Sequence, residues 1–148
     1  LGMKTVGYDP FLDAERAATI SPNLRFTDDL LDLCASCDYI TIHVPATPKT
    51  KGMIGADEIA AMKEGAAFLN FSRDTLVDND AMRAGLTSGK VRRYVTDFAT
   101  PEVMTMEGAL VLPHLGASTA EAEENCAEMA VREVMDYLET GKKVHCVN

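Results

Sequence analysis

The chain lacks several features that mark whole classes of protein. It has no cluster of Lys and Arg, and 14 basic residues face 23 acidic ones, which leaves a formal net charge of -9. A surface that neutralises phosphates needs clustered cations, so we expect no nucleic-acid partner. No apolar run is long enough to cross a bilayer, and the first residues do not show a secretory pattern. We therefore expect no membrane association and a cytoplasmic location.

The four cysteines do not form the two close pairs of a typical zinc site. Cys34 and Cys37 have the C-x-x-C spacing of a zinc or redox motif, but Cys126 and Cys146 stand far apart and form no second pair. A zinc site of this type needs two close pairs, so we predict no metal. We interpret the cysteines as small, reduced core or surface residues, with redox or metal chemistry at the C-x-x-C pair as the alternative.

Strand-like and helix-like segments alternate along the chain. The length suits one domain or a piece of one, with enough apolar residues for a core. The run 66–71 is almost unbroken in apolar character, as in strands of parallel sheets that are covered on both faces. This alternation predicts an α/β fold with a mostly parallel sheet. Strands are predicted at 3–10, 23–26, 39–44, 66–71, 93–98 and 109–112, and helices at 28–35, 55–62, 78–87 and 120–139.

Capping residues define where these helices begin. Thr27 and Asp78 are predicted N-caps, and Ser118-Thr119-Ala120-Glu121 fits a capping box. Gly141 is the predicted stop of the last helix. The segment rich in Asp, Ala and Pro that follows Pro10 is predicted to be a loop.

Polar groups follow three of the predicted strands. Arg73 follows 66–71, Glu102 follows 93–98, and His114 follows 109–112. The carboxyl ends of parallel strands meet at one edge, where open α/β sheets bind their ligands. We therefore expect an arginine, an acid and a histidine to converge there.

Each of these side chains has a chemical and a structural interpretation. The Arg73 fork would grip a substrate carboxylate and polarise the adjacent carbonyl, or it would form a local salt bridge with Asp74. His114 would exchange a proton with an alcohol or carbonyl oxygen, with Glu102 holding its tautomer, or it would be a buried histidine at the sheet rim. The chemical roles, an arginine that binds the carboxylate and a histidine that exchanges a proton, form the arrangement that hydride transfer needs.

Two aspartates also end strands. Asp97 would accept a hydrogen bond from a cofactor carboxamide, or it simply ends its strand. Asp9 would bind the adenosine ribose of a dinucleotide, with a glycine-rich turn about 20 residues earlier, before Leu1, or it is a turn residue before Pro10. No G-x-G-x-x-G occurs in the chain. A carboxylate at the ribose repels a 2'-phosphate, so NAD is preferred over NADP. His43 is interpreted as a strand-end core residue.

Taken together, seven stretches resemble the D-isomer-specific 2-hydroxyacid dehydrogenases, and within that family the D-3-phosphoglycerate dehydrogenases. These stretches are 2–10, 37–45, 62–66, 70–73, 88–91, 96–98 and 113–119. The resemblance implies a partial doubly wound parallel sheet (Rossmann-like) that lacks the first strand and the Gly-rich turn. Residues 1–148 would be the C-terminal part of a dinucleotide-binding domain, with the substrate domain absent. The implied reaction is NAD-dependent oxidation of 3-phospho-D-glycerate to 3-phosphooxypyruvate, which begins serine synthesis.

The resemblance also implies roles for single residues. Arg73 would bind the 2-oxo acid, and His114, paired with Glu102, would be the proton donor and acceptor. The cofactor contacts implied by the family are Asp9, Val44, Pro45, Phe71, Ser72, Arg73, Asp97, His114, Gly116 and Ala117.

Two positions depart from the family pattern. Asp74-Thr75 stands where the family has two glycines after its arginine, and Glu102 follows a proline where the family's acid precedes one. We expect the chain to be inactive alone. The missing strand would lie between the strand that ends at Asp9 and the one that begins near Tyr39, leaving two unpaired strand edges. We expect the chain to close this gap or to associate through it, and we expect a homo-oligomer.

Other functions remain open on this scaffold. One is an NAD-sensing binding protein that resembles the C-terminal-binding-protein corepressors. Another is a different D-2-hydroxyacid dehydrogenase, such as a glyoxylate/hydroxypyruvate reductase. The last is a structural remnant that binds no ligand.

Overall fold

The computed structural model describes residues 2–21 and 23–145. The chain forms two compact units, residues 1–113 and residues 114–148, and each is described by itself. The elements of the first unit are β1 (Thr5–Tyr8), α1 (Ala14–Ile20), β2 (Leu24–Thr27), α2 (Leu30–Ser36), β3 (Tyr39–Ile42), α3 (Ala56–Ala61), β4 (Ala66–Asn70), the 3-10 turn η1 (Asp74–Leu76), α4 (Asn79–Ser88), β5 (Val91–Thr96), α5 (Pro101–Met104) and β6 (Ala109–Val111). The second unit contains α6 (Ala120–Thr140).

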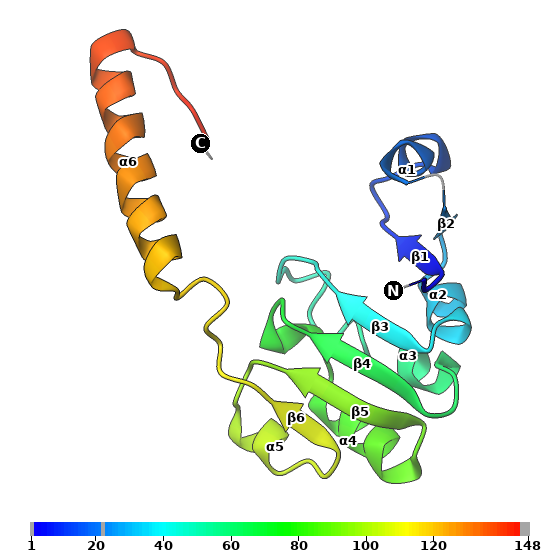
Figure 1. Ribbon diagram of the computed structural model, residues 1–148. Helices are drawn as coiled ribbons and strands as arrows, with labels where there is room; N and C mark the ends of the chain where they lie inside the picture. The colour runs from blue at the N-terminus through cyan, green and yellow to red at the C-terminus, as the bar shows by residue number, and fades with distance from the viewer. Residues whose placement is uncertain (1, 22, 146–148) are drawn as a thin grey trace. The chain divides into compact units, whose positions relative to one another are not determined.

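The strand pairs of the described residues are all parallel. β1 pairs with β2, and a four-stranded sheet has the order β3-β4-β5-β6. Figure 1 shows the arrows of the four-stranded sheet pointing the same way, so the carboxyl ends of its strands share one edge. The register sets Ile42 opposite Asn70 and Asn70 opposite Thr96 at that edge. The predicted α/β class with a parallel sheet is confirmed.

Backbone pairing stops between the two sheets. Among the described residues β1 has β2 as its partner and β3 has β4, and no pair joins β1 to β3. The predicted break between the strand before Asp9 and the strand at Tyr39 is thus confirmed, and the described chain does not close it. Association through the break stays a prediction.

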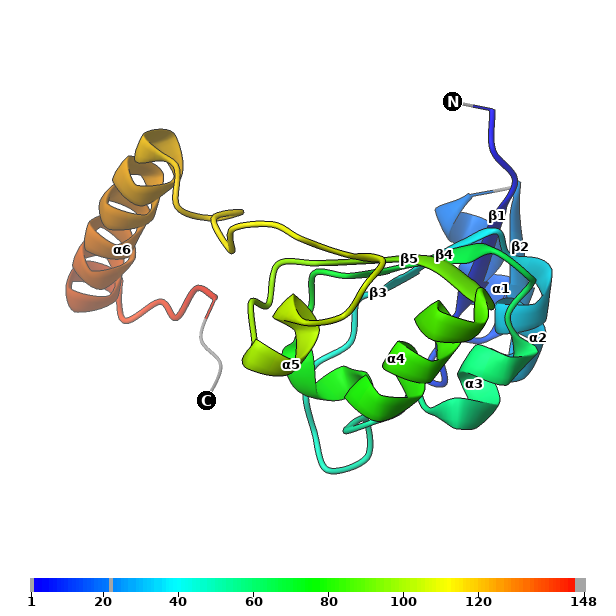
Figure 2. The same cartoon turned by 90° about the horizontal axis from the view of Figure 1, so that it is seen from below.

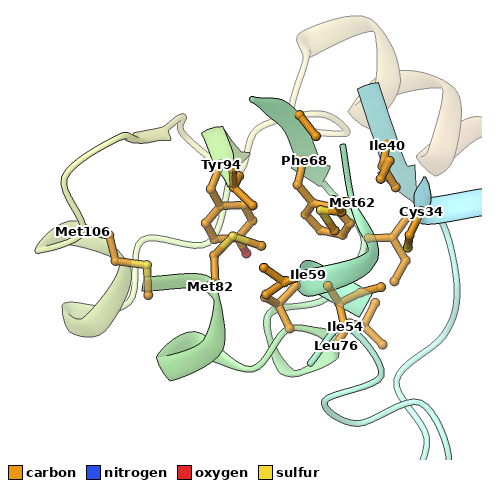
Figure 3. Packing of buried hydrophobic residues seen from close by; sticks show 14 of the residues in the cluster. Cys34, Ile40, Ile54, Ile59, Met62, Phe68, Leu76, Met82, Tyr94 and Met106 are labelled. Atoms are coloured by element: carbon orange, nitrogen blue, oxygen red, sulfur yellow. The ribbon is translucent and has the colours of Figure 1, made fainter. Parts of the chain in front are cut away.

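The core lies between the four-stranded sheet and its helices. Figure 2 shows α3 and α4 on one face of this sheet. Figure 3 shows Phe68 and Tyr94 pointing into that layer from β4 and β5, with ring centroids 6.1 Å apart, beside Met62 and Met82. Each of these four side chains is at most 1 % exposed. Complete burial of a large side chain contributes roughly 1.5–3 kcal/mol, so this layer stabilises the sheet edge that carries the polar groups.

Several helix starts differ from the predicted ones. The segment after Pro10 contains α1 instead of a continuous loop, because the Asp13 carboxylate accepts from the Arg16 N–H at 2.8 Å. α2 is capped by Asp29 and not by Thr27, since the Asp29 side chain accepts from the Leu31 N–H.

β5 and the N-cap of the last helix differ from the predictions in smaller ways. Thr119, the second residue of the predicted capping box, caps α6 through the Ala122 N–H at 3.1 Å in place of Ser118, and the helix begins at Ala120. The helix does end at Gly141, which has φ 70°. β5 begins at Val91, two residues before its predicted start, because that side chain is buried.

The two helix ends of α4 were predicted correctly. Asp78 caps it through the N–H groups of Asp80 and Ala81, both at 3.0 Å, and Gly89 ends it with φ 80°. Within the described residues no helix is both long and apolar enough to cross a membrane.

Gly85 allows α4 to approach its neighbours closely. A Cβ at this position would lie 2.7 Å from Ile59 Cγ2 and 3.2 Å from Val91 Cγ2. Alanine favours a helix by about 1 kcal/mol over glycine, but overpacking a core costs about 1–3 kcal/mol. We therefore expect Gly85→Ala to lower the free energy of unfolding in chemical denaturation. Thr87→Ala, at an exposed position of the same helix, is the control and should raise the free energy of unfolding slightly. A higher free energy of unfolding in Gly85→Ala would contradict the close approach.

Cys34 is a core residue, as predicted, and is 0 % exposed. Burial raises the pKa of its thiol from 9.0 to about 11, so the thiol stays protonated near neutral pH. The described cysteines are free thiols, and no three His, Cys, Asp or Glu side chains gather as a metal site in 2–21 and 23–145.

This burial predicts a loss of stability at high pH. The folded protein holds the Cys34 proton more tightly than the unfolded chain does, so the stabilisation is complete below pH 9 and is lost as pH rises toward about 11. The loss should reach about 2–3 kcal/mol. The free energy of unfolding, measured by chemical denaturation, should fall less between pH 8 and pH 10.5 in Cys34→Ala than in the parent protein. In Cys37→Ala it should fall as much as in the parent. An equal fall in the free energy of unfolding in all three proteins would count against a protonated buried thiol.

Candidate functional site

The site is built on the turn that follows β4. Asn70, the last residue of that strand, is 0 % exposed and uses its side-chain amide to shape the next three residues. Its Oδ1 accepts from the Ser72 N–H at 3.1 Å, and its Nδ2 donates to the Arg73 carbonyl at 2.8 Å. A buried amide needs such partners, because leaving it unpaired costs free energy. The fold of this turn is therefore tied to the burial of Asn70.

A second hydrogen bond joins the ends of two neighbouring strands. The Ser72 hydroxyl donates to the Val44 carbonyl at 2.7 Å, so the segment after β4 is fastened to the segment after β3. Pro45 and Phe71 flank this link and are exposed. The structure thus brings together the predicted cofactor contacts that follow β3 and β4.

Arg73 presents its guanidinium at the surface of this edge. Its Nη1 donates to the Ser72 carbonyl at 2.6 Å, and within the described residues it forms no ion pair with Asp74. Asp74 Oδ1 instead accepts from the Thr75 N–H at 2.8 Å. The interpretation of Arg73 as half of a local salt bridge is therefore wrong, and its remaining N–H groups are available to an anion.

Glu102 lies in the first turn of α5. Thr100 caps this short helix by accepting from the Val103 N–H at 3.3 Å, and Pro101 occupies its first turn, where a missing N–H costs nothing. The Glu102 carboxylate is exposed and makes no hydrogen bond or ion pair with another described residue. A proline before the acid is thus compatible with a helix that leaves the carboxylate accessible.

A cavity of about 480 Å³ opens between η1, α4 and α5. Its lining includes Glu102 together with Asp74, Asp78 and Asp80, and Lys51 is its cationic residue. This excess of carboxylates gives the cavity a negative potential that disfavours an anion. Arg73 is not part of the lining.

The remaining strand ends carry the two predicted aspartates. Asp97 follows β5 and is half-buried beside Thr96, whose hydroxyl accepts from the Phe98 N–H at 3.2 Å. Asp9 follows β1, and its Oδ1 accepts from the Phe11 N–H at 2.8 Å. Asp9 therefore has the turn role that its position before Pro10 indicates, while its Oδ2 makes no hydrogen bond within the described residues.

His114 belongs to the second unit, as do Gly116 and Ala117. Because each unit is described by itself, the pairing of His114 with Glu102 stays a prediction. His43 is exposed and its Nε2 lies 2.9 Å from Thr41 Oγ1, so its interpretation as a core residue is wrong.

The sequence reasoning missed Tyr94, a residue that supports the Asn70 turn. Tyr94 is 1 % exposed, and its hydroxyl lies 3.5 Å from Asn70 Nδ2. Burial raises the pKa of this phenol, so it stays neutral beside the amide. The sequence offered one signal for such a partner: Asn70 is a polar residue at the end of an apolar strand, and a buried amide needs a hydrogen-bonding neighbour. Its partner on β5 is separated from it by 24 positions, which no local pattern encodes.

The sequence matches one family model over residues 1–116, described as "D-isomer specific 2-hydroxyacid dehydrogenase, NAD binding domain". It is 36 % identical over 143 residues to a D-3-phosphoglycerate dehydrogenase of Methanocaldococcus jannaschii, covering 93 % of this chain and 27 % of that protein. A protein of the same name from Mycobacterium tuberculosis is 39 % identical over 83 % of this chain and 24 % of its own length. The chain thus spans about a quarter of the length of these relatives.

Solved structures agree with this relationship. The holo form of Rhodotorula graminis D-mandelate dehydrogenase has a TM-score of 0.81 and 26 % identity, covering 93 % of this chain and 41 % of that one. The NAD complex of a D-isomer specific 2-hydroxyacid dehydrogenase from Lactobacillus delbrueckii has a TM-score of 0.83 over 99 % of this chain and 49 % of its own; at 23 % identity it supports the fold alone. The solved structures confirm the Rossmann-like fold, and the family model, described as an NAD binding domain, confirms NAD as the cofactor of this domain. The chain belongs to the D-isomer specific 2-hydroxyacid dehydrogenase family, through the NAD-binding domain of that family.

Proposed function

We propose that this chain is the C-terminal part of the dinucleotide-binding domain of an NAD-dependent D-2-hydroxyacid dehydrogenase, whose substrate domain lies outside residues 1–148. The proposed reaction is the oxidation of 3-phospho-D-glycerate to 3-phosphooxypyruvate. The observation that carries it is the Asn70 turn, which presents Arg73 at the carboxyl edge of a parallel sheet in a member of this family. Relatives at 36 % and 39 % identity that are named D-3-phosphoglycerate dehydrogenase support the choice of substrate.

Arg73 is proposed to bind the reacting end of the substrate. Its guanidinium can form two parallel hydrogen bonds to a carboxylate, and it can polarise the neighbouring C2 oxygen. The Asn70 and Ser72 contacts limit the freedom of its backbone, so fewer conformations are lost when the substrate binds. The carboxylates that line the neighbouring cavity disfavour an anion there, whereas Arg73, which is not part of that lining, offers a positive charge.

His114 is proposed to move the proton. In the oxidation it accepts the proton of the C2 hydroxyl while the C2 hydrogen leaves as a hydride, and in the reduction it returns the proton to the carbonyl oxygen. Glu102 would accept the other imidazole N–H and so hold the tautomer that this transfer requires. The exposed carboxylate of Glu102, without a partner in the described part of the chain, is consistent with this role.

The residues at the strand ends fit NAD. When bound, NAD supplies the acceptor of the hydride. Asp9 Oδ1 is used in its own turn, and Oδ2 remains to accept from a ribose hydroxyl. Val44 and Pro45 would border the adenosine, and Phe71, Ser72, Asp97, Gly116 and Ala117 would line the nicotinamide side. The glycine-rich pyrophosphate turn is not among residues 1–148.

The substrate assignment predicts a ranking of 2-oxo acids. With the full-length protein and NADH, we expect kcat/KM to be highest for 3-phosphooxypyruvate, followed by hydroxypyruvate and glyoxylate. Oxidation of NADH followed by absorbance measures this ranking. Faster turnover of glyoxylate would assign the protein to a reductase of that acid, and NADH binding without turnover of any acid would favour a sensor protein.

A matched pair of histidine variants tests whether this turnover uses the proposed proton carrier. His114→Ala should lower kcat by about 10²–10⁴-fold while NADH binding is retained. His145→Ala is the control, because His145 is exposed and its Nδ1 contacts Glu133 of α6 at 2.7 Å. Full turnover by His114→Ala would remove His114 from the mechanism.

The role of Asp9 can be separated from its role in the turn. Asp9→Asn keeps an oxygen that accepts from the Phe11 N–H but removes the negative charge. We expect it to improve NADPH binding relative to NADH by about tenfold or more, since one like charge at the 2'-phosphate is removed. Fluorescence titration with both cofactors measures the ratio. Asp13→Asn, which likewise keeps a capping oxygen and removes a charge, should leave the ratio unchanged; an unchanged ratio in Asp9→Asn as well would place the ribose elsewhere.

A further inference from the structure

The helix that carries Glu102 is too short to be stable alone. α5 has four residues, and forming the first turn of a helix is unfavourable because several dihedral angles are fixed for one hydrogen bond. Within α5 that bond is Met104 N–H to the Thr100 carbonyl at 2.9 Å. Val103, which is 3 % exposed, packs one side of the turn into the core. The position of Glu102 must therefore depend on contacts from outside α5.

Arg83 of α4 supplies such contacts. Its Nη2 donates to the Glu102 carbonyl at 2.8 Å and to Thr105 Oγ1 at 3.1 Å, and its Nη1 lies 3.4 Å from the Thr105 carbonyl. The Thr105 hydroxyl also donates to the Glu102 carbonyl, at 2.9 Å. A guanidinium is suited to this place, because its planar fork reaches several acceptors and a cation is favourable at the C-terminal end of a helix.

The N-terminal end of α4, one turn before Arg83, is anchored to the segment that follows Arg73. η1 follows Arg73 directly, and Asp78 then caps α4 while its N–H donates to the Ile54 carbonyl at 3.0 Å. The Arg73 carbonyl is itself held by Asn70. One ten-residue helix therefore joins the segment that presents the proposed anion-binding arginine to the turn that presents the proposed acid.

We propose that Arg83 is a positioning residue, which fixes the α5 turn so that the Glu102 carboxylate keeps a constant place relative to Arg73. This inference rests on the proposed role of Glu102 in orienting His114. Arg83 touches the Glu102 backbone and leaves the carboxylate unpaired within the described residues. Its loss thus leaves the chemical group intact and removes only the restraint on its position.

The experiment compares Arg83→Gln, Arg83→Lys and Arg93→Gln in the full-length protein. Arg93 on β5 is the control, because it is exposed and within the described residues its guanidinium bonds the neighbouring Arg92 carbonyl and nothing on α5, so its loss removes an equal charge without touching α5. Amide hydrogen exchange of residues 103–106 should become about tenfold faster or more in Arg83→Gln and less so in Arg83→Lys, since hydrogen bonds to a charged donor are lost. It should be unchanged in Arg93→Gln. Unchanged exchange in Arg83→Gln overturns the proposal.

A kinetic comparison links this restraint to Glu102. Arg83→Gln should lower kcat by about tenfold with little change in the KM for NADH, and Arg83→Gln/Glu102→Gln should be no slower than Glu102→Gln alone. Independent losses that multiply in the double variant overturn the positioning role. If Glu102→Gln keeps full kcat, the proposed function of Glu102 fails, while the exchange rates still decide separately whether Arg83 holds α5.

Discussion

A single buried amide organises the functional edge of this chain. Asn70 lies at the carboxyl end of β4 with no exposed surface, and its amide has to find hydrogen-bond partners inside the protein. It finds them in the Ser72 N–H, the Arg73 carbonyl and the Tyr94 hydroxyl. The same bonds that satisfy the amide bend the chain out of the sheet. The direction in which Arg73 leaves β4 is therefore a consequence of burying a polar group.

Two groups of opposite charge adjoin this turn. The exposed Arg73 guanidinium has most of its N–H groups available, whereas carboxylates line the cavity beside α4, and Arg73 is not part of that lining. Two of these carboxylates stabilise the backbone: Asp78 caps α4, and Asp74 accepts a hydrogen bond from the Thr75 N–H. The negative charge next to Arg73 thus stabilises the backbone of the turn. The departure from the family pattern at Asp74 therefore has a structural role in this chain.

The sequence could predict the parts of the fold that depend on local patterns. The apolar run of β4 and the caps of α4 at Asp78 and Gly89 follow from burial and from backbone geometry over a few residues. The placement of polar groups at strand ends follows from parallel pairing. This argument correctly located Arg73 and Asp97 at the carboxyl edge of the four-stranded sheet. Two helices were missed: α5 has four residues, too few to show a period, and α1 lies in the segment rich in Asp and Ala after Pro10, whose composition favours a loop.

The contacts that complete the site could not be read from any window of sequence. Tyr94 meets Asn70 across 24 positions, and Arg83 meets Glu102 across 19. Such pairs exist only after the sheet register and the packing of α4 have been established. The sequence could therefore name the chemical groups at the edge, but the residues that hold them in place required the three-dimensional structure.

Asp9 depends on a different support from the rest of the site. No backbone pair joins β1 to β3 among the described residues, so the strand before Asp9 is not aligned with Arg73 by the sheet. The connection runs through α2 instead: Arg25 of β2 bonds Asp32 of that helix at 3.0 Å, and Cys34 of the same helix is fully buried in the core below β3. The position of Asp9, the proposed ribose ligand, therefore depends on side-chain packing of one helix, whereas the position of Arg73 depends on the parallel sheet. Packing without a strand pair restrains less motion, so under the proposed roles binding of the adenosine half should be more sensitive to changes in α2 than binding of the substrate carboxylate at Arg73.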